Sequence, residues 1–203
     1  MKAKRLLRAV CLCAAVISVL FLSACGGGSS EESASETSEL LNGACTARFT
    51  MEDGGSFVIK CYPEYAPETV ENFLTLVSSG FYDGLTFHRV LDDFVAQGGD
   101  PNGNGTGGSS ERIHGEFPDN GFEQNTLTHK RGSVAMARSS NPDSASSQFY
   151  ICYTDLPSLD GSYAVFGEVT EGMDVIDGFL SVPRDSAGMP ETPITISRAE
   201  IVE

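Results

Sequence analysis

Apolar side chains recur along this chain with two different spacings, and the clearer one is helical. Over residues 66–80 the apolar positions repeat at intervals of three and four residues, which places them on one face of a helix. Pro67 suits the first helical turn, where its missing N–H removes no hydrogen bond, and Gly80 is a natural stop. We therefore expect a core helix here. Its apolar face consists of Val70, Phe73, Leu74 and Val77.

The second spacing is that of β-strands. Residues 47–51 and 56–59 are rich in strand-forming side chains and flank a turn at 53–55, so they predict a hairpin. A second, shorter helix is predicted over residues 171–180. Many short strands with two helices favour a closed β-barrel whose ends the helices cover. The remaining predicted strands are residues 132–137, 148–153, 163–169 and 194–201.

The first 24 residues have the pattern of a secretion signal. Four basic residues precede a largely apolar run over residues 9–21, which is too short for a membrane span of ~20 residues. Leu-Ser-Ala-Cys follows at 22–25 and resembles the lipobox at which bacterial lipoproteins are cleaved and lipidated. We expect cleavage after Ala24 and a lipid on Cys25. A plain signal peptide and an uncleaved anchor are the alternatives.

Residues 25–42 predict a flexible tether between that anchor and a domain at 43–203. Residues 26–39 are only Gly, Ser, Thr, Ala and Glu, which cannot build a core. The whole chain has a net charge of −15, and removal of the signal with its four basic residues leaves 9 Lys and Arg against 28 Asp and Glu. This excess argues against nucleic-acid binding and predicts repulsion from anionic lipid. We expect a monomeric domain outside the bacterial cell membrane, held to it by the lipid alone.

Three cysteines fall within the predicted domain, namely Cys45, Cys61 and Cys152. None belongs to a C-x-x-C pair, so we expect no metal site. The compartment outside the membrane permits disulfides. Cys45 and Cys61 are equally distant from Asp53, so a turn centred there places them opposite each other. A two-residue Asp53-Gly54 loop would shift the register so that the two cysteines are one residue out of alignment. The sequence leaves the pairing open.

Candidate chemistry concentrates in residues 86–100. One cation, Arg89, stands among apolar residues there, and the amide Gln97 follows it. Arginine is always charged and presents its donors in a rigid fork, so beside an apolar pocket it can direct a hydrogen bond at a neutral substrate. His88 is interpreted as a wall residue that supports Arg89, not as an acid or base.

Three other kinds of chemistry are not favoured. The nucleophile motif G-x-S-x-G of serine hydrolases is absent. Residues 103–108 fit G-x-G-x-x-G, but no apolar helix follows, so a surface loop is favoured over a dinucleotide site. Asp92 and Asp93 are adjacent and would point apart, unlike the converging carboxylates of glycosidases. We expect no cofactor.

Residues 86–100 also resemble the signature of the cyclophilin family of peptidyl-prolyl cis-trans isomerases, with Phe-His-Arg-Val at 87–90 and Phe-Val-Ala-Gln-Gly-Gly-Asp at 94–100. The resemblance covers about residues 43–203. It implies an eight-stranded antiparallel β-barrel, isomerase activity on proline-containing polypeptides, and no cofactor. Further matching segments, in the same order along the chain, are residues 66–73, 105–108, 136–138, 147–151, 159–161 and 165–167.

The resemblance assigns roles to particular positions. Arg89 falls where the family has its catalytic arginine, and Gln97 falls on the glutamine that supports this arginine and the substrate backbone. His88 is their supporting neighbour. The other positions that the resemblance places at the substrate are Phe94, Val95, Ala137, Arg138, Gln148, Tyr150, Leu159 and Tyr163.

The chain departs from many relatives at some of these positions. Val95 replaces a methionine, and Tyr150 replaces a phenylalanine. Arg138 stands in place of asparagine, and Tyr163 in place of histidine. Ser158 aligns with the tryptophan of cyclosporin-binding relatives, which argues against tight cyclosporin binding.

Elementary chemistry agrees with an isomerase. The barrier to rotation about an X–Pro bond is ~18–20 kcal/mol and arises from amide resonance, so no nucleophile, metal or cofactor is needed to lower it. A fixed cation stabilises the twisted amide more than the planar one. An acceleration of ~10⁵-fold requires only about 7 kcal/mol. We expect an isomerase that assists the folding of extracytoplasmic proteins, and the alternative is a chaperone module that binds proline segments with little turnover.

Overall fold

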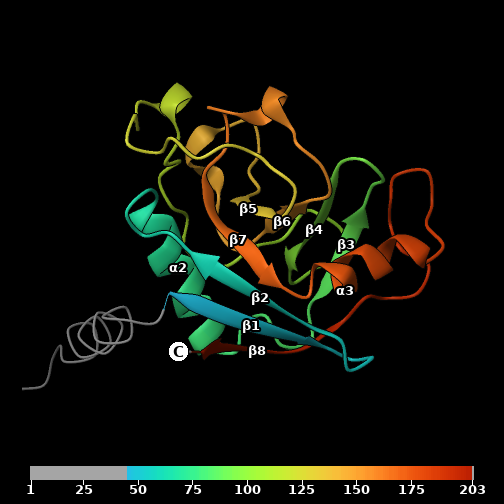
Figure 1. The fold of residues 1–203 in the computed structure, drawn as a ribbon. Coiled ribbons are helices and arrows are strands. Elements are labelled where there is room, and N and C mark those ends of the chain that lie inside the picture. The colour runs from blue at the N-terminus through green and yellow to red at the C-terminus, as the bar shows by residue number, and fades with distance from the viewer. Residues whose placement is uncertain (1–44, 203) are drawn as a thin grey trace, which may run out of the picture.

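The structure, a computed structural model, describes residues 45–202 as one curled sheet of eight antiparallel strands with two α-helices. The strand order is β3-β4-β6-β5-β7-β2-β1-β8 (Figure 1). The predicted signal, Cys25, the whole predicted tether and the first two residues of the predicted domain lie outside the described residues. The elements are β1 (Thr46–Met51), β2 (Ser56–Cys61), α2 (Pro67–Ser78), β3 (Thr86–Val90), β4 (Val95–Asp100), β5 (Ser133–Met136), β6 (Phe149–Cys152), β7 (Val165–Glu171), α3 (Met173–Gly178) and β8 (Ile196–Val202), with short 3₁₀ turns at Pro118–Asn120, Pro142–Ser144, Pro157–Leu159 and Phe179–Ser181.

The predicted hairpin is confirmed as β1 and β2. Its turn is centred on Asp53, because the Met51 N–H donates to the Gly55 carbonyl at 2.8 Å. Cys45 and Cys61 therefore stand opposite each other, and the Cys61 N–H donates to the Cys45 carbonyl at 2.6 Å. Both are free thiols in the structure. Burial, and then the neighbouring Cys45, raise the pKa of the Cys61 thiol.

The predicted helix is confirmed as α2, and its four apolar residues are all buried. Phe73 stands at the centre of the core, with its ring centroid 4.9 Å from that of Phe166 and 5.6 Å from that of Phe149. The helix α3 adds Ile176 to the same core, and the 3₁₀ turn that continues it adds Phe179. In Figure 1 the two helices lie toward opposite ends of the β1–β2 hairpin.

The first turn of α2 is held by a residue distant in sequence. The buried carboxylate of Glu116 accepts hydrogen bonds from the N–H groups of Glu68, at 3.0 Å, and Thr69, at 2.8 Å. These are N–H groups that an α-helix cannot satisfy by itself, and a negative charge suits this end of the helix. Glu116 thus acts as a long-range N-terminal cap of α2.

We expect Glu116→Gln to lower the free energy of unfolding by about 1–3 kcal/mol, because the amide keeps one acceptor and turns an N–H group toward a buried N–H. Chemical denaturation measures this loss. The matched control is Glu71→Gln on the exposed side of α2, which should change stability by less than about 0.5 kcal/mol. Equal effects of the two substitutions would contradict the capping role.

The sheet curls so that its end strands approach each other. β3 meets the chain before β8 through one isolated bridge between Thr86 and Thr195 and through the Phe87 N–H, which donates to the Ile194 carbonyl at 2.9 Å. The observed form is a curled half-barrel, and the predicted complete closure is not confirmed. The strands β3 and β4 come from residues 86–100, which the apolar pattern did not assign to strands. Within residues 45–202, no helix is long and apolar enough to cross a membrane.

Candidate active site

Three neighbouring strands bring three of the predicted site residues to one face of the sheet. Arg89 on β3 is in register with Gln97 on β4, which is in register with Tyr150 on β6. Side chains alternate between the two faces of a sheet, so these three form a row that faces away from the main core. The adjacent row, which lies in the main core, consists of Val90, Ala96 and Ile151.

A cavity of about 220 Å³ lies over this row. Its inner part belongs to a small apolar cluster that is separate from the main core and includes Val95 and Tyr150. Two guanidinium groups, those of Arg89 and Arg138, stand at its wall. A cavity of this kind suits a small apolar ring with a polar amide beside it. The residues that line it are Arg89, Phe94, Val95, Gln97, Ala137, Arg138, Tyr150, Leu159 and Tyr163, all of them predicted site positions.

Arg89 is oriented by its neighbours, and within residues 45–202 its guanidinium donates only one hydrogen bond. Its Nη1 donates to Oε1 of Gln97 over a long 3.4 Å, and its guanidinium lies 5.5 Å from the ring centroid of Phe94. Gln97 in turn donates from Nε2 to Oε1 of Gln148 at 2.8 Å, and Gln148 donates to the Gly107 carbonyl at 2.7 Å. Gln148 thus supports Gln97 from outside the cavity and does not line the cavity itself. The amide chain orients Arg89 without neutralising its charge.

Arg138 and Tyr163, two departures from many relatives, pack against each other. The Arg138 guanidinium lies 4.5 Å from the Tyr163 ring centroid and 5.1 Å from that of Phe117. Its Nη2 also donates to the Ser162 carbonyl at 2.7 Å. Stacking on aromatic faces and hydrogen bonding to a carbonyl are both typical of arginine. This cation is therefore fixed at the wall of the cavity.

A buried hydrogen-bonded chain that the sequence did not predict lies behind the cavity. The Tyr150 hydroxyl lies 2.9 Å from Nε2 of His129, whose Nδ1 lies 2.9 Å from a carboxylate oxygen of Asp160. Burial lowers the pKa of His129, against the opposing effect of Asp160, and burial raises the pKa of Tyr150. We assign the neutral imidazole, with Nδ1–H donating to Asp160 and Nε2 accepting from Tyr150. The chain fixes the Tyr150 ring in the pocket.

His88 does not line the cavity. Its side chain is buried with Nε2 beside Gly105 of the glycine-rich loop, and neither ring nitrogen has a hydrogen-bond partner among the described residues. Burial lowers its pKa, while Asp100 acts in the opposite direction. This placement is compatible with a supporting position and not with contact to a substrate in the cavity. Residues 45–202 contain no group of three or more His, Cys, Asp and Glu side chains that could hold a metal ion.

Stability is expected to fall as the pH falls from 7.5 to 5.5. His88 and His129 both have pKa values below the ordinary 6.5 in the folded state, so the unfolded chain binds more protons in this window and protonation favours unfolding. Denaturation curves at several pH values measure the slope. His129→Gln should make the slope shallower, since one of the two histidines is then gone. A slope unchanged in His129→Gln would contradict this origin.

Known proteins resemble this chain in both sequence and fold. Residues 46–201 match the model of the cyclophilin type peptidyl-prolyl cis-trans isomerase family. A peptidyl-prolyl cis-trans isomerase of Helicobacter pylori is 47% identical over 137 residues, 66% of this chain and 80% of that protein. Peptidyl-prolyl cis-trans isomerase B of Bacillus subtilis is 46% identical over 129 residues, 64% of this chain and 86% of that protein.

A solved structure is also similar. The crystal structure of a cyclophilin type peptidyl-prolyl cis-trans isomerase from Cryptosporidium parvum superposes with a TM-score of 0.70 at 30% sequence identity, covering 79% of this chain and 98% of that one. A structure of the same protein in the presence of the dipeptide Ala-Pro gives the same TM-score at 31% identity, covering 78% of this chain and 99% of that one.

Proposed function

Because this chain belongs to the cyclophilin-type family of peptidyl-prolyl cis-trans isomerases, we propose that its isomerase reaction takes place in the cavity beside Arg89. The observation that carries this proposal is an oriented guanidinium, with one side-chain hydrogen bond among the described residues, next to a cavity of about 220 Å³ whose inner part is apolar. The reaction rotates X–Pro peptide bonds, for which uncatalysed exchange takes tens to hundreds of seconds.

During the reaction the cavity holds the proline ring of the substrate while the peptide bond before it rotates. The proline ring lies against Phe94, Val95 and Leu159, and the Tyr150 ring closes the cavity behind it. As the amide twists, its nitrogen loses resonance and gains a free lone pair, which accepts a hydrogen bond that the planar amide cannot accept. Arg89 donates that bond, so its stabilisation is largest in the twisted state, as catalysis requires.

The test of this activity is the purified full-length protein in a coupled assay with a proline peptide. We expect catalysed rates well above the uncatalysed rate and proportional to the protein concentration. Well-folded protein that leaves the rate at the uncatalysed value would overturn the assignment. Under that outcome a proline-binding module, which holds its ligand without turnover, would be the better description.

We further infer that the isomerase acts outside the bacterial cell membrane, anchored by a lipid on Cys25, on proline-containing clients that fold there. The support is the order of the N-terminal signals: basic residues, apolar run, then Leu-Ser-Ala-Cys at 22–25. After removal of the signal the chain has 9 Lys and Arg against 28 Asp and Glu, and this negative charge keeps the domain away from anionic headgroups. Residues 26–39 are long enough to let it reach unfolded clients, and the domain works as a monomer.

Cys25→Ser should abolish incorporation of a clickable fatty acid by bacterial cells that produce the full chain. The matched control is Cys13→Ser, which lies in the segment expected to be removed and should leave the lipid label intact. Labelling that persists in Cys25→Ser, or that is lost equally in Cys13→Ser, would contradict lipidation at Cys25. Protease added to spheroplasts should digest the wild-type domain, and protection of the domain would contradict its location outside the membrane.

A further inference from the structure

A second hollow of about 290 Å³ adjoins the proline cavity and shares Gln97, Ala137 and Arg138 with it. Its far side is formed by the glycine-rich loop at 105–108 and by Arg112. An extended polypeptide advances about 3.3–3.6 Å per residue, so a chain whose proline occupies the first cavity places a side chain within three residues of it at the second hollow. One extended polypeptide segment can therefore contact both hollows.

The charged residues that line the two hollows are basic, whereas the chain as a whole is acidic. The chain has 28 acidic and 13 basic residues, yet no carboxylate side chain lines either hollow. Three cations line them, namely Arg89, Arg112 and Arg138. The remaining polar groups in the second hollow are neutral hydroxyls and amides, including Ser139, Ser144 and Gln148.

These three arginines also differ from others in their pairing. Arg131, Arg184 and Arg198 each form an ion pair with a carboxylate, whereas the ion pairs of residues 45–202 include none of the three arginines at the hollows. The partners of the paired arginines are Asp177, Asp92 and Glu200 respectively.

A buried carboxylate, that of Asp100, lies beside the glycine-rich loop but lines neither hollow. Asp100 is buried, and its two oxygens accept hydrogen bonds from the N–H groups of Asn102, Asn104 and Gly105. Arg112 is exposed at the mouth of the hollow, and Arg138 is fixed at its wall by stacking. Neither arginine forms an ion pair among residues 45–202, so both can attract an acidic side chain of a ligand.

We propose that the second hollow selects substrates with an acidic side chain within three residues of the proline. This inference rests on the proposed function, because it concerns the same bound segment. Arg112 meets the carboxylate as a mobile cation, and Arg138 supplies a fixed positive field at the wall. A substrate with a lysine at the same position is disfavoured, because Arg112 and Arg138 repel its positive charge. The net charge of the protein alone predicts the reverse preference for basic substrates, so the two explanations are separable.

The experiment measures kcat/KM for a set of peptides by a protease-free NMR exchange assay, because a coupling protease has its own preference for charge. The peptides carry Glu, Ala or Lys at each of the three positions on either side of one proline. At low ionic strength we expect the best Glu peptide to exceed the matching Lys peptide by about 5- to 30-fold, the range of two partly exposed ion pairs. Raising the salt should reduce the ratio.

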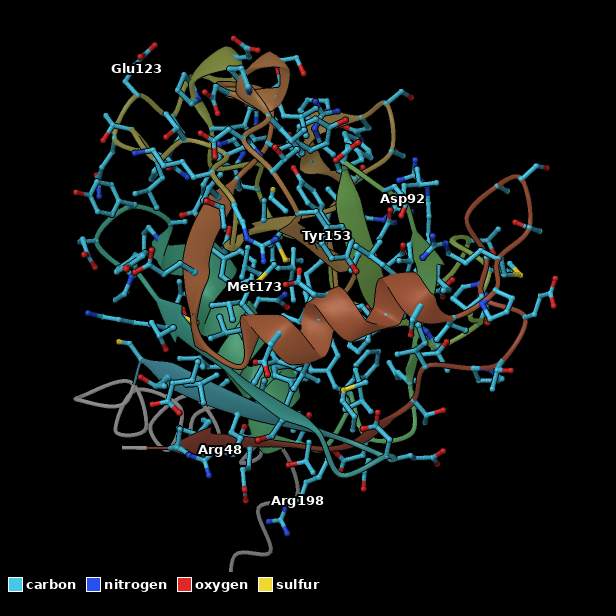
Figure 2. The ribbon with its side chains drawn as sticks, turned by 45° about the vertical axis from the view of Figure 1, so that its right-hand side comes forward. Arg48, Asp92, Glu123, Tyr153, Met173 and Arg198 are labelled. Carbon is cyan, nitrogen blue, oxygen red and sulfur yellow. The ribbon has the colours of Figure 1, made fainter. Side chains whose placement is uncertain are left out.

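Arg112→Gln should lower the Glu-to-Lys ratio to about 2- to 5-fold, because the field of Arg138 remains, and Arg112→Lys should restore most of the ratio because the charge is kept. The matched control is Arg198→Gln on β8, which makes the same change in net charge at an exposed position and should leave the ratio unchanged. Arg48 and Arg198 lie on the side of the molecule opposite to Asp92, the residue at the β3–β4 turn (Figure 2).

A preference for Lys peptides, or a ratio that falls equally in Arg112→Gln and Arg198→Gln, would overturn the inference. An active enzyme whose ratio is near one at every position would overturn it as well, and would leave the proposed function standing. If no peptide is isomerised, the proposed isomerase function is wrong, and charge selection has to be tested without turnover. Fluorescence anisotropy of the same labelled peptides then tests charge selection by binding alone, and equal affinity for the Glu and Lys peptides would overturn it.

Discussion

Replacing Arg89 by alanine is expected to lower kcat/KM for a neutral proline peptide by about 10²- to 10³-fold, the usual effect of removing one donor that acts in the transition state. The loss should fall on kcat more than on peptide affinity, because the apolar wall of Phe94, Val95 and Leu159 remains. Arg89→Lys should recover only part of the rate, since an ammonium group lacks the rigid fork of donors that Gln97 orients.

The matched control for Arg89→Ala is Arg198→Ala, which removes the same side chain from an exposed position on β8. It should leave kcat/KM within about twofold of the wild type. Circular dichroism and denaturation should show that both variants are folded. A loss confined to KM in Arg89→Ala would mean that Arg89 only holds the peptide, and this would contradict its role in the twisted state.

Phe73→Ala is expected to lower the free energy of unfolding by about 3–5 kcal/mol, as for other buried aromatic residues. Phe73 is fully buried on α2, and its ring contacts those of Phe49, Tyr82, Phe149 and Phe166. Truncation removes these contacts and leaves a cavity at the point where α2 meets the sheet.

Chemical denaturation at pH 7.5 measures the effect of Phe73→Ala, with the exposed substitution Thr75→Ala on the same helix as the control. Thr75→Ala should change stability by less than about 0.5 kcal/mol. A loss of less than about 1 kcal/mol in Phe73→Ala would contradict the central place of this ring in the core.

The sequence predicts the fold best where the signal is local. The helix at 66–80 was recognised because its apolar positions repeat at the helical period, and α2 buries each of them. Strands β3 and β4 were missed in residues 86–100. Two consecutive residues there, Phe87 and His88, are both buried, and the register shifts between Phe87 and Arg89, so apolar and polar positions do not alternate.

Local sequence patterns do not predict contacts between residues that are far apart in the sequence. Glu116 caps a helix that begins almost fifty residues earlier, and nothing in its own neighbourhood signals that role. The degree of closure is likewise set by how β3 and β8 approach each other after the whole sheet has curled. Such features depend on the complete topology.

The candidate site was predicted from the resemblance, because its residues fall within contiguous motifs. The structure brings nine of these positions around one cavity, places Gln148 beside it, and leaves His88 buried outside its lining. The His129–Asp160 chain and the unpaired Arg112 were missed, since each depends on partners that are brought close, or kept away, by the fold.

The most direct test of the account is the rate of cis–trans exchange of a proline peptide bound to the full-length protein, measured by NMR exchange spectroscopy at saturation for wild type and Arg89→Ala. We predict fast exchange of the bound peptide in the wild type, and exchange slower by about 10²-fold or more in Arg89→Ala with the peptide still bound. Equal exchange rates in the two bound complexes would contradict the claim that Arg89 stabilises the twisted amide.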